Sequence, residues 1–103
     1  MRLKPSDQKK ITKTLLGFLP EKSRIYLFGS RTRDEARGGD IDLLCVLSSS
    51  DLVSEIKKKK REALEVLKKD VGDRRIDLRF CVDSDFDKDP FLQSIREQMI
   101  ELK

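Results

Sequence analysis

The sequence predicts a small α/β (α+β) domain in which a mixed β-sheet of three to four strands is flanked by helices. Three short runs of apolar, β-prone residues, at 24–28, 40–47 and 75–82, are the candidate strands. Stretches with apolar residues at helical spacing lie before, between and after these runs. At 103 residues the chain can bury a real core but has little length to spare, so we expect one domain over residues 1–103.

The first helix is predicted from a cap and an apolar stripe. Ser6 or Asp7 can accept a hydrogen bond from the first free amides of the helix, and Pro20 ends it. The apolar positions recur at helical spacing: Ile11, Leu15, Phe18 and Leu19. We expect this stripe to cover one face of the sheet.

A second helix is predicted over residues 52–71, between the second and third strands. The serines at 48–50 and Asp51 break the preceding strand and offer caps, and Gly72 is the expected stop. The apolar stripe consists of Leu52, Ile56, Ala63, Leu64 and Leu67.

The C-terminal part of the chain is predicted to form a loop and a last helix. We expect a loop over residues 83–89, with Asp89 as the cap and Pro90 at the first helical position. The apolar stripe that follows is typical of core packing or of a partner contact, and it contains Leu92, Ile95, Met99 and Leu102.

The absence of histidine excludes several kinds of active site. General acid–base catalysis by histidine, Ser-His-Asp triads and His-containing zinc sites all need this residue. Cys45 alternates in phase with Ile41, whereas Cys81 alternates in phase with Asp77, so we expect two free, buried thiols on opposite faces of the sheet. No apolar run resembles a signal peptide or could span a bilayer, so we expect a cytoplasmic protein without membrane contacts.

The surface is highly charged and mildly basic. Charged residues make up 41% of the chain and the net charge is +4, which favours anionic partners, nucleotides included. The basic run at 57–61 could form a nucleic-acid patch, but Glu55, Glu62 and Glu65 lie within about one helical turn of it. A solvated helix face is the better interpretation. Aromatic residues for base stacking are scarce, so we do not expect direct nucleic-acid binding.

Three aspartates occupy strand positions where their carboxylates could meet. Asp40 and Asp42 open the second strand and project to the same side, and Asp77 opens the third. Neighbouring carboxylates repel one another unless a cation lies between them, and Mg²⁺ prefers oxygen ligands. Each aspartate taken alone could instead form a surface ion pair, and Asp77 could pair with Arg75 or Arg79.

A phosphate site is predicted just before the second strand. Gly29 permits a sharp turn and close approach of a ligand, and Ser30 can cap a short helix. Backbone amides at a helix start attract anions. Arg31, Arg33 and Arg37 follow, and guanidinium groups suit phosphate oxygens.

Together these motifs resemble those of a minimal nucleotidyltransferase of the DNA polymerase β superfamily. The pattern is a Gly-Ser pair, a variable spacer, an Asp-x-Asp and a later Asp, here Gly29, Ser30, Asp40, Asp42 and Asp77. The resemblance implies the polymerase β-type nucleotidyltransferase fold. It also implies two Mg²⁺ ions, with Asp40 and Asp42 binding both ions. Asp77 would hold the catalytic ion and help to deprotonate the nucleophile.

The resemblance also implies how phosphate is bound, which reaction occurs and which partner is involved. Ser30 and the amides near Gly29 would hold the β- and γ-phosphates, and Arg31 or Arg33 would neutralise their charge. The reaction would transfer a nucleotidyl group, AMP from ATP, to a protein acceptor. Stand-alone members of this size resemble the antitoxin of a toxin–antitoxin pair whose other half is a helical HEPN protein (higher eukaryotes and prokaryotes nucleotide-binding).

A second hypothesis is a non-catalytic binding module that neutralises a partner toxin by masking it. The compact, charged surface and the lack of an additional acceptor-binding domain within the 103 residues motivate this alternative.

Overall fold

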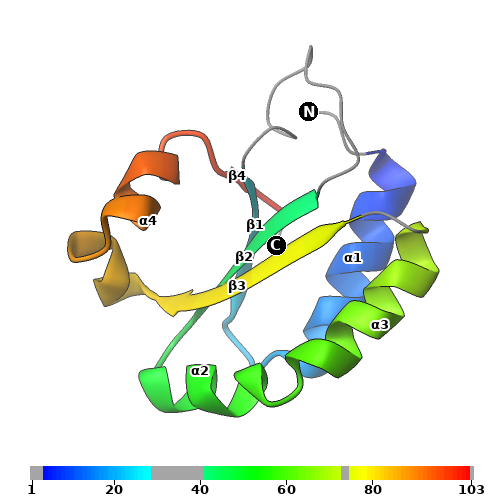
Figure 1. Ribbon diagram of the computed structural model, residues 1–103, viewed down its shortest axis with the longest axis horizontal. Helices are drawn as coiled ribbons and strands as arrows, with labels where there is room; N and C mark the ends of the chain where they lie inside the picture. Colours follow the sequence, from blue (N-terminus) through cyan, green and yellow to red (C-terminus); the bar gives the residue numbers. More distant parts are fainter. Residues whose placement is uncertain (1–3, 29–40, 73–74, 103) are drawn as a thin grey trace.

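The computed structural model describes residues 4–28, 41–72 and 75–102, and they form a four-stranded sheet with helices on both faces (Figure 1). The strand order is β3-β2-β1-β4. The strands are β1 (Arg24–Phe28), β2 (Ile41–Leu47), β3 (Ile76–Val82) and β4 (Ile100–Glu101). Strand β2 runs parallel to β3 and antiparallel to β1, and β4 is antiparallel to β1. The predicted mixed sheet is therefore confirmed.

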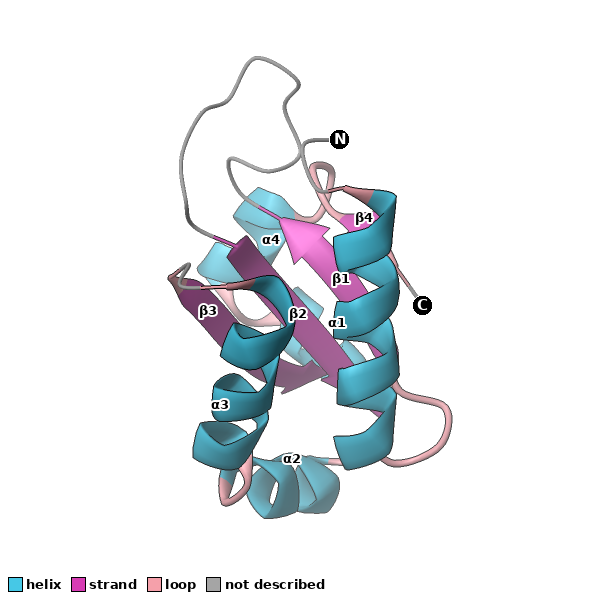
Figure 2. Ribbon diagram, turned by 90° about the vertical axis from the view of Figure 1, so that its right-hand side faces the viewer, coloured by secondary structure: helices cyan, strands magenta, loops and turns pink. Residues whose placement is uncertain are grey.

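Three helices pack against one face of the sheet, and two shorter helical segments cover part of the other. Helices α1 (Pro5–Phe18) and α3 (Lys60–Val71) lie side by side across the first face (Figure 2). Helix α2 (Ser50–Lys57) follows the end of β2. The 3₁₀-helix η2 (Asp83–Asp87) and α4 (Pro90–Ile95) lie on the opposite face. None of the helices in the described part of the chain is long and apolar enough to cross a membrane.

Strand β2 is buried on both of its faces, which explains its almost continuous apolar sequence. Its residues Ile41, Leu43, Cys45 and Leu47 belong to the first core, which also contains side chains of α1, α2, α3, β1 and β3. Leu44 and Val46 face the second core, the buried cluster of Phe28, Leu44, Val46, Cys81, Phe86, Leu92 and Ile95. Successive side chains of β2 therefore point to opposite faces of the sheet, as the sequence predicts.

Cys45 and Cys81 are both free and buried, and they belong to different cores, as expected. Burial raises the pKa of the Cys45 thiol to about 12. An unfolded cysteine ionises near pH 8.5–9, so between about pH 9 and 12 only the unfolded state releases this proton. The stability that the neutral, buried thiol provides is complete below about pH 9 and is lost as the pH rises toward 12.

We therefore expect Cys45 to make folding sensitive to alkali. Between about pH 8 and pH 10.5, its ionisation should lower the free energy of unfolding by about 2 kcal/mol. Urea unfolding of the wild type and of Cys45→Ala at both pH values isolates this contribution, because the cavity cost of the substitution does not depend on pH. An equal loss of stability in the two proteins would contradict the prediction.

The first helix begins earlier than predicted, because neither Ser6 nor Asp7 is its N-cap. Lys4 is the N-cap residue and Pro5 occupies the first helical position, so Ser6 and Asp7 lie inside the first turn. Proline suits this position because its fixed φ is already helical and its missing amide would have had no partner there. The end of the helix at Phe18, shortly before Pro20, agrees with the prediction.

The single helix predicted over 52–71 is wrong: the chain forms α2 and α3 with a turn between them. Ser49 caps α2 through a hydrogen bond from the Leu52 amide, and Lys59 has a non-helical backbone (φ −101°, ψ 2°). The turn falls within the basic run at 57–61. This run has no apolar side chain to bury, so no core contact keeps the two helical axes collinear. Gly72 follows α3 with φ 88°, a backbone conformation that favours glycine.

The basic run itself is largely exposed, which agrees with a solvated surface. Lys58 pairs with Glu55 at 3.6 Å, and Arg61 pairs with Glu65 at 3.9 Å. Exposed pairs of this kind contribute little to stability, about 0–1 kcal/mol each.

The helix predicted to carry the stripe through Leu102 is also wrong in its second half. Asp89 caps α4 and Pro90 begins it, as predicted, but the helix ends at Ile95 and the chain continues to β4. The reason is that Met99 packs on the second core whereas Leu102 packs on the first. One helix cannot reach both faces of the sheet. A strand at the sheet edge can, and the Leu102 amide donates a 2.7 Å hydrogen bond to the Ile25 carbonyl.

The segment 83–89, predicted as a loop, contains the 3₁₀-helix η2. Its turn places Phe86 in the second core, and the Asp85 carboxylate accepts a 3.1 Å hydrogen bond from the Val82 amide. Burial of one phenyl ring thus gives order to a segment whose other residues are polar.

Candidate active site

Asp42 and Asp77 are register partners on the adjacent parallel strands β2 and β3. Each is the second residue of its strand, so both lie at the same edge of the sheet. Neighbouring strands are about 4.8 Å apart and side chains directly across from one another share a face, so the two carboxylates project side by side. Phe28 is the register partner of Asp42 on the other side, at the end of β1.

The face to which these aspartates project is the face of the second core. Leu44 and Val46 follow Asp42 at alternate positions of β2 and belong to that core, and Cys81 does the same on β3. Both aspartates are half-buried, whereas the apolar positions farther along the strands are covered by η2 and α4. The aspartates therefore lie just beyond the part of this sheet face that η2 and α4 cover.

A polar pocket of about 520 Å³ opens at this position. It is lined by Asp42, Arg75, Ile76, Asp77 and Arg79. A pocket of this size is large enough for a small ligand, and its lining combines carboxylate oxygens with guanidinium groups. Such a lining can hold a cation and an anion next to each other.

Arg79 neutralises part of the negative charge in the pocket. Its Nε donates to Oδ2 of Asp77 at 3.2 Å, and both side chains remain about half exposed. Its guanidinium also lies 4.5 Å from the centroid of the Phe91 ring. The sequence left open an ion pair of Asp77 with Arg75 or Arg79. The structure shows this ion pair with Arg79.

The aromatic ring that contacts Arg79 packs against a second aromatic ring. Phe91, at the start of α4, meets Phe28 edge-to-face with the ring centroids 5.8 Å apart and an interplanar angle of 81°. Phe28 is the register partner of Asp42, and Phe91 contacts the Arg79 guanidinium that pairs with Asp77. The two packed rings therefore connect the surroundings of the two aspartates. The role of Phe91 was not foreseen from the sequence. Its contacts join residues far apart in the chain, and no local pattern signals them.

The remaining predicted site residues lie outside the described part of the chain. These are Gly29, Ser30, Arg31, Arg33 and Asp40, together with Arg37. The described residues on either side of this segment are Phe28 and Ile41. Phe28 is the register partner of Asp42, and Ile41 is its neighbour in the chain, so both belong to the same edge of the sheet as the two aspartates.

Among the described residues, no group of three or more acidic, cysteine or histidine side chains could hold a metal ion. This part of the chain supplies two carboxylates, Asp42 and Asp77, on one face. Their hard oxygen donors suit Mg²⁺, which takes one or two protein carboxylates and completes its coordination with water and substrate phosphates. The donor set therefore fits a magnesium ion that is shared with a phosphate-bearing substrate.

Comparison with known proteins identifies the family to which the chain belongs. The chain matches the family described as “Nucleotidyltransferase domain” over residues 6–101, so it is a member of the nucleotidyltransferase domain family. The family resemblance predicted from the sequence motifs is thereby confirmed, as is the polymerase β-type fold.

A chain of a solved structure is similar to this chain over most of its length. That structure is described as “Crystal structure of the toxin-antitoxin with AMP-PNP”. The matched chain is 22% identical, the match covers 93% of this chain and 72% of that one, and the TM-score is 0.54. At this identity the likeness shows the shared fold. No curated protein matches the sequence.

Proposed function

We propose that this protein is a Mg²⁺-dependent nucleotidyltransferase that transfers AMP from ATP to a protein acceptor. The observation that carries the proposal is the placement of Asp42 beside Asp77 on one sheet face in a member of the nucleotidyltransferase domain family. Nucleotidyl transfer needs carboxylates for metal ions and donors for phosphates, and it does not need histidine. The whole chain, 1–103, would form this one domain and act in the cytoplasm.

Each proposed site residue has a defined role. Asp42 and Asp77, together with Asp40, would hold two Mg²⁺ ions, which when bound activate the attacking oxygen and stabilise the leaving pyrophosphate. Asp77 would also help to remove the proton of the attacking group. The phosphates would be held by the residues that connect β1 to β2: Gly29, Ser30, Arg31 and Arg33.

Arg79 gives Asp77 a counter-charge before the cation binds. Because the Arg79 guanidinium is close to Asp77 and is also held against Phe91, it reduces the repulsion between the paired carboxylates in the free protein. A cation at Asp77 would compete with this ion pair. The guanidinium is then available for the phosphate oxygens of the incoming nucleotide.

For the partner we propose a HEPN-domain toxin that this protein modifies, so that the pair forms a toxin–antitoxin system. The support is the fold shared with a chain from a toxin–antitoxin structure that was determined with AMP-PNP. The open polar pocket at the sheet edge is also accessible to a protein side chain.

The proposal is tested with ATP labelled at either the α- or the γ-phosphate. Each preparation is incubated with Mg²⁺, the purified protein and a copurified partner, and the label on protein is measured. We expect label to be transferred only from the α-position and only when Mg²⁺ is present. Transfer of the γ-label, or no transfer of either label to the copurified partner, would contradict the proposal.

A further inference from the structure

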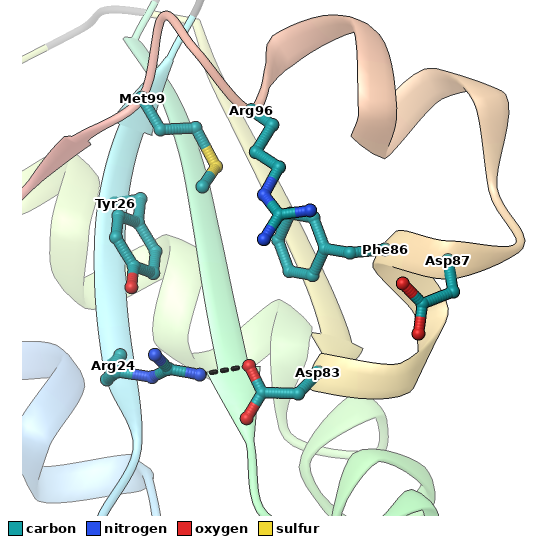
Figure 3. A pocket seen from close by; sticks show the side chains of 7 residues that line it. All are labelled: Arg24, Tyr26, Asp83, Phe86, Asp87, Arg96 and Met99. Atoms are coloured by element: carbon teal, nitrogen blue, oxygen red, sulfur yellow. Dashed lines mark hydrogen bonds and ion pairs between the residues drawn. The ribbon is translucent and has the colours of Figure 1, made fainter.

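A second pocket lies beside β1 on the same sheet face as Asp42 and Asp77 (Figure 3). Arg24 and Tyr26 alternate along β1 with Phe28, the register partner of Asp42, so all three project to this face. The pocket has a volume of about 310 Å³. Its main lining residues are Arg24, Tyr26, Asp83, Phe86, Arg96 and Met99.

The apolar part of the pocket belongs to the folded core. Phe86 is only 9% exposed and is a member of the second core. Tyr26 and Met99 are partly buried and pack against the same core. Packing therefore fixes the walls of this pocket.

Hydrogen-bond donors from two opposite walls face the pocket. Arg24 extends from β1, forms an ion pair with Asp83 of η2, and lies 6.0 Å from the centroid of the Tyr26 ring. From the other side, the Arg96 guanidinium lies 5.8 Å from the centroid of the Phe86 ring. Figure 3 shows the Arg24 guanidinium reaching across to Asp83, the Tyr26 hydroxyl directed toward Arg24, and the Arg96 guanidinium over the Phe86 ring. Within the described segments, Arg96 has no ion-pair partner.

We propose that this pocket binds the carboxylate side chain, glutamate or aspartate, of a protein that docks on this face of the sheet. Arginine and tyrosine donors match the two oxygens of a carboxylate, and the apolar walls suit the methylene groups that carry it. The identification of the docked protein with the acceptor of the nucleotidyl group rests on the proposed function.

The apolar walls favour a carboxylate side chain over a phosphate group, which has no methylene groups to place against them. The two arginines are balanced by Asp83 and by Asp87, which also lines the pocket, so the lining carries no net charge that would attract a dianion. A volume of about 310 Å³ is at the lower end of the range for small-molecule sites, and it leaves room for one side chain. A protein that covers both pockets would be anchored here while its reactive group lies near Asp42 and Asp77.

The proposal is tested by binding, without any nucleotide. The probe is a capped Gly-Glu-Gly peptide, titrated into the protein while NMR follows the Tyr26 ring and the Met99 methyl group. We expect saturating shifts of both signals with a dissociation constant of a few mM, about the strength of one charged contact. Arg96→Gln should weaken binding at least about fivefold. Arg61→Gln, which removes an exposed arginine of α3, should change it less than about twofold.

Two further titrations separate the anion sources. A capped Gly-Gln-Gly peptide should give no saturating shift, and inorganic phosphate should bind more weakly than the glutamate peptide. The proposal would be overturned by equal binding of the glutamine peptide, by tighter binding of phosphate, or by no shift of Tyr26 and Met99 up to about 20 mM peptide. None of these outcomes depends on nucleotidyl transfer, so failure here is distinguishable from failure of the proposed function.

Discussion

Replacement of Asp42 by asparagine should reduce nucleotidyl transfer at least about a thousandfold, which corresponds to about 4 kcal/mol of transition-state stabilisation. Asparagine keeps the size of the side chain but removes the negative charge that would hold the cation beside Asp77. The free energy of unfolding should change by less than about 1 kcal/mol, because the substitution also removes the repulsion between neighbouring carboxylates. The rate of α-label transfer and thermal unfolding measure the two effects.

Asp51→Asn is the matched control for this variant. Asp51 is an exposed residue in the first turn of α2, so the same chemical change there should leave transfer unaffected. If Asp42→Asn transferred the label as fast as the wild type, the catalytic role of Asp42 would be ruled out. A protein that acted only by masking its partner would keep full control of that partner in the variant.

Replacement of Leu43 by alanine should lower the free energy of unfolding by about 3 kcal/mol. Leu43 lies in the middle of the sheet, with Leu27 of β1 and Leu78 of β3 as its register partners, and all three are 0% exposed. The variant loses apolar burial and leaves a cavity that neighbouring strands cannot fill without breaking their register. Because domains of this size are stable by about 5–15 kcal/mol, the loss is a large share of the total.

Leu16→Ala provides the comparison for this stability prediction. Leu16 is on α1 but is 43% exposed, so its truncation should cost less than about 1 kcal/mol. Urea unfolding at neutral pH measures both variants. Equal destabilisation by the two substitutions would contradict the assignment of Leu43 to the centre of the first core.

The strands β1, β2 and β3 and the strand positions of Asp42 and Asp77 could be predicted because they depend on local alternation. Cys45 and Ile41 share one face of β2 and Asp42 takes the other, as a period of two residues requires. The sequence motif also indicated that Asp77 would join Asp42. What it could not provide was the parallel pairing of β2 with β3, which places these residues directly opposite one another.

The features that were not predicted depend on contacts between distant parts of the chain. Strand β4 forms because Met99 and Leu102 pack on opposite faces of the sheet, a constraint that is absent from the helical spacing of the sequence. The contact of Phe91 with Arg79 likewise depends on where α4 lies over β3. The turn between α2 and α3 falls in a basic run that is compatible with one long helix when propensity alone is considered.

The proposed cation site can be tested directly by adding Mn²⁺ to isotope-labelled protein and observing which backbone amide signals broaden. We expect broadening to centre on Asp42 and Asp77 and to disappear from both positions in Asp42→Asn. The chain contains a competing acidic segment, Asp83, Asp85, Asp87 and Asp89, which provides an internal comparison. Broadening centred on that segment, or unchanged broadening at Asp77 in the variant, would contradict a cation site formed by Asp42 and Asp77.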